Sequence, residues 1–255
     1  MQGRVSIDCS GQKVIVTGGS RGIGRAIAER FVANGAHVAI CGRTPLAEPI
    51  EGALFHALDI RDPDQAAAFV DAVADEFGGL DVLVNNAGGS PEAPASEASP
   101  RFIEAVVRLN LLAPMNLARA AHRHMAAEGW GSIVNIASVS GTRPSPGTAA
   151  YGAAKAGLLN ATQTLAQEWG PQGIRVNAIV AGLMATETAD QTYGDDAAQS
   201  RIAASLPLGR MGTGGDIADT VVWLCSDAAN WVSGARINVD GGGERPLFLE
   251  LLKGN

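Results

Sequence analysis

The sequence has few residues of the types that build disulfide frameworks or metal sites. Its three cysteines, Cys9, Cys41 and Cys225, are widely separated, and it contains no CxxC motif. His122 and His124 form the closest pair among the histidines, but an i,i+2 spacing in an expected helix points their rings to different sides. Neither a disulfide framework nor a zinc site is indicated, and we expect no metal ion.

Basic clusters, long apolar runs and linkers are also missing. The formal net charge is −7 and no stretch is rich in Lys and Arg, which argues against nucleic acid or an anionic membrane surface as the main partner. No apolar run follows a basic segment near the N-terminus, and none approaches the ~18 residues of a membrane span, so we expect a cytoplasmic protein. Without a Pro- or Ser-rich boundary, residues 1–255 are expected to form one domain.

The sequence does contain a regular alternation of short apolar runs and helical patterns. Strands are expected over 13–17, 37–41, 54–59, 82–85, 132–137, 175–180 and 236–239, and helices over 23–34, 63–77, 100–128, 149–169 and 216–226. This order predicts an α/β fold, a single Rossmann-type doubly wound parallel sheet of about seven strands with helices on both faces. Between the second and third strands too few residues remain for a crossover helix, so an irregular crossing is expected there.

Tyr151 and Lys155 are the pair around which a catalytic reading can be built. Their four-residue spacing in the expected helix places the phenol and the ammonium on one face. A cation beside a phenol favours the phenolate and lowers its pKa, so Tyr151 could exchange a proton with a carbonyl or an alcohol. From residues 151–155 alone, the alternative is that Tyr151 and Lys155 form a chance pair on a solvated helix face.

The segment 17–24, Thr-Gly-Gly-Ser-Arg-Gly-Ile-Gly, lies between a strand and a helix. Its glycines let the backbone approach a pyrophosphate, and the N–H groups at the helix start favour an anion. It also contains the G-x-S-x-G pattern of a hydrolase nucleophile elbow. Such an elbow lies deep in its fold, after an oxyanion loop, and needs an acid and then a histidine downstream, whereas this segment follows the first strand and the last histidine is His124. Walker A spacing fails as well, because Arg25 and Ala26 stand where Lys and Ser or Thr are needed.

Taken together, these motifs make the sequence resemble the short-chain dehydrogenase/reductase family, from about Gly11 to Gly242. The nearest branch is the β-ketoacyl-carrier-protein-reductase-like one. The resemblance rests on five features in the family's order: the glycines Gly18, Gly22 and Gly24, the segment Asn85-Asn86-Ala87-Gly88, Asn110, Ser138 thirteen positions before Tyr151 and Lys155, and Val239-Asp240-Gly241-Gly242.

The resemblance implies a catalytic set of Ser138, Tyr151, Lys155 and Asn110. Tyr151 would be the general acid in reduction and the general base in oxidation, with its pKa lowered by Lys155 and by the positive nicotinamide. Lys155 would also hold the nicotinamide ribose. Ser138 would donate a hydrogen bond to the substrate oxygen, and Asn110 would interrupt its helix to bind a water that relays protons.

The implied cofactor contacts follow the carboxyl ends of the strands. They are Gly18, Ser20, Arg21, Gly22, Ile23, Gly24, Arg43, Asp59, Ile60, Asn86, Ala87, Gly88, Tyr151, Lys155, Ile179, Gly182 and Thr186. Asp59 and Ile60 would hold the adenine edge, although Asp59 could instead be the N-cap of the helix at Pro63. Ala181 replaces the proline usual in the family, which weakens the assignment of the neighbouring turn.

The choice of cofactor depends on the end of the second strand. NAD-preferring relatives carry an aspartate at the position of Gly42, Arg43 follows it, and Arg21 lies in the glycine loop. Two arginines without an acid favour NADP(H), since an arginine accommodates the 2′-phosphate, and NAD(H) stays possible. Arg43 facing water, with weak discrimination, is the alternative.

The substrate is a small carbonyl or alcohol compound that the sequence does not choose further. In relatives a mobile lid corresponds to residues 183–210, and Ser90, Ser140 and Met184 are expected to line the pocket. Arg143 is the candidate for an anionic group. A β-ketoacyl thioester, a steroid or alicyclic ketone, and a sugar or polyol all remain open.

The resemblance also implies self-association as a homotetramer, or a dimer, through the helices 100–128 and 149–169 and the last strand. The tail extension 244–255 is apolar and too short for its own core, so it is expected to dock on a neighbouring subunit or near its active site.

The preferred prediction is NADP(H)-dependent ketone reduction. The alternatives are an NAD-dependent secondary alcohol, polyol or hydroxysteroid dehydrogenase, a lyase or epimerase that uses the cofactor transiently, and a non-catalytic dinucleotide-binding regulatory protein.

Overall fold

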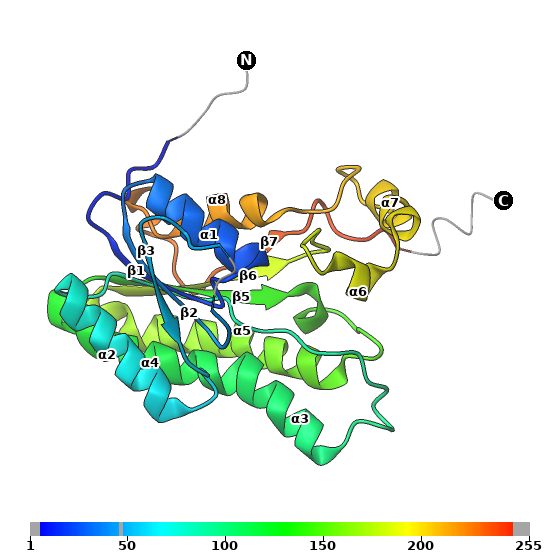
Figure 1. The fold of residues 1–255 in the computed structure, drawn as a ribbon, viewed down its shortest axis with the longest axis horizontal. Coiled ribbons are helices and arrows are strands. Elements are labelled where there is room, and N and C mark those ends of the chain that lie inside the picture. Colours follow the sequence, from blue (N-terminus) through cyan, green and yellow to red (C-terminus); the bar gives the residue numbers. More distant parts are fainter. Residues whose placement is uncertain (1–5, 46–47, 247–255) are drawn as a thin grey trace.

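Seven short apolar segments pair into one parallel sheet, shown in Figure 1 for the residues that the computed structural model describes, 6–45 and 48–246. In sheet order the strands are β3 (Ala53–Ala57), β2 (His37–Gly42), β1 (Lys13–Thr17), β4 (Val82–Asn85), β5 (Gly131–Ser138), β6 (Ile174–Ala181) and β7 (Arg236–Val239). Every neighbouring pair is parallel. The predicted fold class is confirmed.

Helices cover both faces of this sheet (Figure 1). On one face lie α1 (Gly22–Ala33) and α8 (Gly214–Leu224), and on the other α2 (Pro63–Phe77), α4 (Ala113–Glu128) and α5 (Ala149–Trp169). Helix α2 begins where Asp62 accepts from the N–H groups of Asp64 and Gln65, with Pro63 in its first turn. Among the described residues, no helix is both long and apolar enough to span a membrane.

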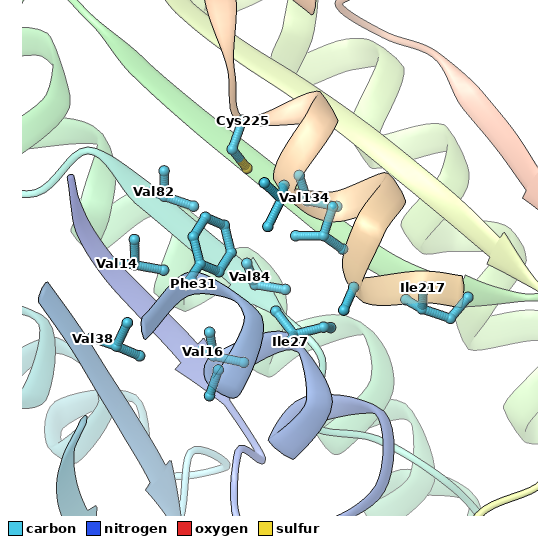
Figure 2. Close-up of a cluster of buried hydrophobic side chains, with 14 of the residues drawn as sticks. Val14, Val16, Ile27, Phe31, Val38, Val82, Val84, Val134, Ile217 and Cys225 are labelled. Carbon is cyan, nitrogen blue, oxygen red and sulfur yellow. The ribbon is translucent and has the colours of Figure 1, made fainter. Parts of the chain in front are cut away.

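The core explains why the strands read as nearly continuous apolar runs. Figure 2 shows Ile27 and Phe31 of α1 pointing at valines of the sheet, with Ile217 of α8 beside them. Phe31 is fully buried there, and burying a side chain of this size stabilises the fold by about 1.5–3 kcal/mol. A strand buried on both faces has no polar side to alternate with. The same burial raises the pKa of Cys41 and of Cys225 to about 12.

Several element boundaries differ from the prediction. Strand β3 ends at Ala57, so Asp59 lies beyond the strand instead of closing it. No helix is found between β2 and β3 in the described part of the crossing, as expected. The helix expected over 100–128 is divided into α3 (Pro100–Val107), the π-helical turn η1 (Arg108–Leu112) and α4.

The strand order reverses between β1 and β4, which is the point where open α/β sheets bind ligands beyond the carboxyl ends of their strands. The turn η2 (Val139–Gly141) follows β5 at this end. In the segment 183–210, where no clean periodicity was visible, the chain forms α6 (Ala189–Tyr193) and α7 (Asp196–Ser205), and Figure 1 shows both near the tips of β6 and β7.

Candidate active site

The glycine loop is shaped by close packing against the loop after β4. Gly18 has a φ of 65°, and a Cβ there would lie 2.9 Å from the Cα of Ala87. A Cβ at Gly24 would lie 2.2 Å from the carbonyl oxygen of Gly18 and 2.3 Å from Nδ2 of Asn86. Larger residues at these positions would push the two loops apart. The structure therefore brings together Gly18, Gly24, Asn86 and Ala87, as the sequence predicted.

Thr17 fastens these two loops, and the sequence analysis did not single it out. Its hydroxyl accepts from the N–H groups of Asn86 and Ala87, each at 3.0 Å, and donates to the carbonyl of Val84 at 3.3 Å. Asn86 returns hydrogen bonds from Nδ2 to the carbonyls of Thr17 (2.9 Å) and Gly18 (3.2 Å). The carboxyl ends of β1 and β4 are thereby locked at the switch point of the sheet. A threonine that ends the strand before the glycines was the signal available.

Glu187 is a second residue that the sequence analysis missed. The N–H of Gly22, at the start of α1, donates to Oε1 of Glu187 at 3.2 Å. Thr186 lies beside the same glycine, since a Cβ built there would come 3.7 Å from its methyl group. The start of a helix favours an anion because its N–H groups are free and its dipole is positive there. A carboxylate of the chain thus sits where the resemblance places the pyrophosphate.

We expect Glu187→Gln to bind NADPH more tightly than the native protein. A carboxylate at a helix start interacts by about 0.3–1 kcal/mol, so removing this competing charge should lower the Kd about two- to fivefold. Titration followed by fluorescence measures the change. Asp190→Asn is the matched control, because it removes an exposed carboxylate three residues further along the same segment. Unchanged or weaker binding in Glu187→Gln would contradict the competition.

The end of the site that the resemblance assigns to the adenosine is rich in arginine. Arg21 and Arg43 are exposed, and Gly42, half-buried, has Ser20 next to it, with 3.4 Å between Oγ and a Cβ built on the glycine. Arg61, which the sequence analysis did not name, holds Asp59: its Nε lies 2.9 and 3.0 Å from the two carboxylate oxygens. Arg61 lowers the pKa of Asp59 and Arg43 contributes to the same lowering.

The role of Asp59 needs one correction and one refinement. It does not cap the helix at Pro63, because Asp62 does. Its carboxylate is already engaged by Arg61, while the neighbouring Ile60 is buried at 6% exposure. A contact from Asp59 and Ile60 to an adenine edge stays a prediction.

Ser138 and Tyr151 meet at the carboxyl end of β5. Ser138 is the last residue of that strand and Tyr151 lies in the first turn of α5. The Ser138 hydroxyl accepts from the N–H of Ser140 at 3.2 Å. Burial raises the pKa of Tyr151, and its hydrogen bond with Ser138 acts in the opposite direction. The pKa of Tyr151 is therefore raised in the protein on its own, and not lowered as expected, because burial of the phenol is the largest effect.

Lys155 lies one helical turn further along α5 and is buried at 2% exposure. Its Nζ donates to the carbonyl of Ile136 at 2.7 Å and lies 5.6 Å from the ring centre of Tyr151. Burial lowers the pKa of Lys155 to about 8. A lysine with this pKa changes charge near neutral pH, which suits a group that passes protons.

We expect Lys155→Met to change how stability depends on pH. The folded pKa of about 8 lies below the unfolded value of 10.5, so the charged lysine destabilises the fold fully below pH 8. As the pH rises from 8 to 10, the unfolded chain binds more protons than the folded one, and the native protein gains about 2 kcal/mol relative to the variant. Chemical denaturation at several pH values measures this, and a difference that stays flat over that range would contradict it.

Asn110 lies in η1 and is fully buried. Its amide forms a two-way clamp on Gly89: Oδ1 accepts from the N–H at 2.9 Å and Nδ2 donates to the carbonyl at 2.9 Å. A Cβ at Gly88 would lie 2.7 Å from Oδ1 of Asn110 and 3.1 Å from Nζ of Lys155. The predicted interruption of the helix is present, and it brings Asn110, Gly88 and Lys155 together. The relaying water stays a prediction.

The remaining predicted residues contact neighbouring turns and loops. Gly182 packs so closely on the turn after β7 that a Cβ would lie 2.6 Å from the Cα of Asp240. Three residues were predicted to line the substrate pocket. Ser90 donates to the carbonyl of Pro91 at 2.8 Å, Ser140 donates to Ser145 at 3.2 Å, and Met184 is buried against Gly212.

Within this set, Ile179 is fully buried in β6, where it packs in the apolar core. Ile23 is half-buried in the first turn of α1. Ile179 thus lies in the strand that precedes Gly182, and Ile23 follows Gly22, whose N–H donates to Glu187.

The site fits a dinucleotide. The loop between β1 and α1 has no room for a Cβ at Gly24, and the N–H of Gly22 already donates to an anionic oxygen, Oε1 of Glu187. The residues that would hold the phosphates are then Ser20, Gly22 and Ile23, and those that would hold the nicotinamide end are Tyr151 and Lys155. Ser138 and Tyr151 lie beside that end, where a substrate oxygen could accept from both hydroxyls.

Comparison with known proteins agrees with this arrangement. A family model described as enoyl-(acyl carrier protein) reductase matches residues 18–244. The cis-4-hydroxycyclohexanecarboxylate dehydrogenase of Sinomonas cyclohexanicum is 38% identical over 89% of this chain and 94% of its own. The acetoacetyl-CoA reductase of Shinella zoogloeoides is 37% identical over 89% and 96%. A crystal structure of a putative short-chain alcohol dehydrogenase from Sinorhizobium meliloti 1021 superposes with a TM-score of 0.86 at 39% identity, covering 93% and 98% of the two chains.

Proposed function

The chain belongs to the short-chain dehydrogenase/reductase family, whose members are NAD(P)-dependent oxidoreductases of hydroxyl and carbonyl groups, and on that premise we propose that it reduces a ketone to a secondary alcohol with NADPH. The observation that carries the proposal is the joint placement of Ser138, Tyr151 and Lys155 beside the glycine loop. A non-catalytic dinucleotide-binding protein would have no need of this set.

In the proposed reaction the bound dinucleotide supplies a hydride to the carbonyl carbon. The hydroxyl of Tyr151 gives its proton to the carbonyl oxygen as negative charge develops there, and Ser138 donates a hydrogen bond to the same oxygen. The raised pKa of Tyr151 keeps the phenol protonated before the step, as a general acid requires. The charge of buried Lys155 then stabilises the phenolate until a proton returns. Oxidation uses the same residues in reverse.

The preference for NADP(H) is supported by charge at the adenosine end. Arg21 and Arg43 are exposed, Arg61 pairs with Asp59, whose pKa Arg43 also lowers, and position 42 is a glycine. An exposed guanidinium can bind a 2′-phosphate through two parallel hydrogen bonds. An acyl-thioester reductase among the relatives is in keeping with a reductive role.

Self-association is the second part of the proposal. Ile103 on α3, Leu112 in η1 and Met115 on α4 are each about two-fifths exposed, at 40%, 43% and 41%, and Trp231, before β7, is 97% exposed. Apolar side chains on these two surfaces support a homotetramer built through the long helices and through the β7 edge. Light scattering measures the mass of the assembly. Of the tail extension, residues 247–255 lie outside the described part, and its docking stays a prediction.

The direct test of the function is a titration with NADPH and NADH followed by a panel of ketones and secondary alcohols, monitored by nicotinamide absorbance. We expect tighter binding of NADPH and its consumption in step with a ketone. Faster oxidation of alcohols with NAD would show that the protein is a secondary alcohol dehydrogenase and not a ketone reductase. Consumption of substrate without net change of nicotinamide would indicate a lyase or epimerase, and binding without any turnover a regulatory protein.

A further inference from the structure

Arg143 lies beside the catalytic serine without a role in the reaction described above. It follows Ser138 by five residues, and its backbone N–H donates to the carbonyl of Val139 at 3.0 Å, which fixes the loop on η2. Its guanidinium forms an ion pair with Glu244, which follows β7. Both side chains are partly open to solvent, at 37% and 38% exposure.

The guanidinium of Arg143 is incompletely paired. Nη2 contacts Oε1 of Glu244, and Nη1 donates to the carbonyl of Pro144 at 3.0 Å. Nε is buried and has no hydrogen-bond partner among the described residues. The edge of an arginine formed by Nε and Nη presents two parallel donors that match one carboxylate. Glu244 uses only one of them, and a buried donor without an acceptor is unfavourable.

Tyr193, at the end of α6, connects this ion pair to the catalytic tyrosine. Its hydroxyl accepts from the N–H of Met184 at 3.4 Å. Burial raises the pKa of Tyr193, Glu244 adds to that effect and Arg143 opposes it, so both charges lie within reach of the phenol. Tyr193 in turn acts on the pKa of Tyr151. Arg143 follows the turn η2 after Ser138 and Glu244 follows β7, so their ion pair joins two segments at the carboxyl end of the sheet.

We propose that Arg143 binds a carboxylate of the substrate and that Glu244 is the chain's own carboxylate, which the substrate displaces. The substrate class is then a hydroxy acid or the corresponding oxo acid. Glu244 is already partly hydrated, so moving it into water costs little, while an incoming carboxylate can engage both Nη2 and the unpaired Nε of Arg143. The inference rests on the proposed function, because it names the substrate class of the same site.

The test compares acids with their neutral esters. Acetoacetate, levulinate and 4-oxocyclohexanecarboxylate are each assayed against the methyl ester with NADPH. We expect at least one acid to exceed its ester about tenfold or more in kcat/KM, the effect of one charge-assisted contact. Arg143→Gln should abolish that preference by raising the KM of the acid. Glu244→Gln should lower the KM of the acid several-fold. If the ion pair were purely structural, the same variant would raise that KM.

Arg123→Gln is the matched control, because Arg123 pairs with Asp71 on the α2 and α4 face and should leave both substrates unaffected. If every ester is reduced as well as its acid, or if Arg143→Gln impairs acid and ester alike, the inference fails. A protein that reduces neutral ketones and none of the acids overturns this inference alone. A protein that turns over no ketone or alcohol overturns the proposed function as well.

Discussion

Tyr151→Phe is expected to lower kcat by about a thousandfold or more while leaving the Kd for NADPH within about twofold of the native value. Proton donation by a positioned side chain contributes about 10²- to 10⁴-fold to a rate, and the variant has no hydroxyl with which to donate that proton. The ring itself remains, so the packing of α5 on β5 should be preserved. Steady-state kinetics and a fluorescence titration on the same preparation provide both quantities.

The chain offers a matched control for this variant in its second tyrosine. Tyr193→Phe removes the same hydroxyl from a phenol that is also partly buried and lies near Tyr151. Its hydroxyl accepts only a long hydrogen bond, from the N–H of Met184 at 3.4 Å, so we expect kcat to fall by less than about tenfold. Substantial turnover in Tyr151→Phe, or equal losses in both variants, would falsify the assignment of Tyr151 as the proton donor.

Gly42→Asp combined with Arg43→Ala is expected to reverse the preference between the two dinucleotides, changing the ratio of their Kd values by about a hundredfold or more. A carboxylate at position 42 accepts from a ribose 2′-hydroxyl and repels a 2′-phosphate, while loss of Arg43 removes a cation that favours the phosphate. There is space for the new side chain. A Cβ at Gly42 would lie 3.4 Å from Oγ of Ser20 and 3.7 Å from Cε2 of Phe55, and no unusual backbone angle is required.

Thr44→Asp controls for the added charge alone. Thr44 is exposed and lies two residues beyond Gly42, so the same carboxylate is introduced outside the end of β2. It should shift the ratio of Kd values by only a few-fold. Because residues 42 and 43 are adjacent, their effects are expected to be non-additive, and both single variants belong in the series. Tight binding of NADH by the native protein would show that the arginines here do not select the cofactor.

The sheet could be predicted because strands buried on both faces carry their own signature. Val14 and Val16 in β1, and Val82 and Val84 in β4, belong to β-branched runs that end at glycine or asparagine. The end of β3 could not be placed, since its burial pattern is mixed. The end of β3 becomes visible only in the structure, where the last residue pair between β2 and β3 is Gly42 with Ala57.

The candidate site likewise has contacts that the sequence predicts and contacts that it does not. Spacing along one helix brings Tyr151 to Lys155, and a motif identifies the glycine loop, because these relations are local. The contact of Glu187 with Gly22 joins residues 165 positions apart, and Arg143 meets Glu244 across 101. No local pattern contains such pairs, which depend on how the strand ends converge.

The environment of a known residue is equally hard to read from a motif. The sequence places a cation near Tyr151 and suggests a lowered pKa. The folded chain buries that phenol, and burial outweighs the single hydrogen bond from Ser138. The balance depends on side chains from several elements, which a four-residue spacing does not contain.

The π-helical turn η1 has a consequence for chain length. One extra residue is accommodated in this turn, so α3 and α4 continue as one rod and keep their phase, although the numbering across the turn is offset by one residue from that of an uninterrupted α-helix. A substitution at Leu109 or Leu111 would change one contact. Removal of Leu109 or Leu111 would instead take out the extra residue, restore an uninterrupted α-helix in which α4 keeps its orientation to the sheet, and remove the bulge that directs Asn110 at Gly89.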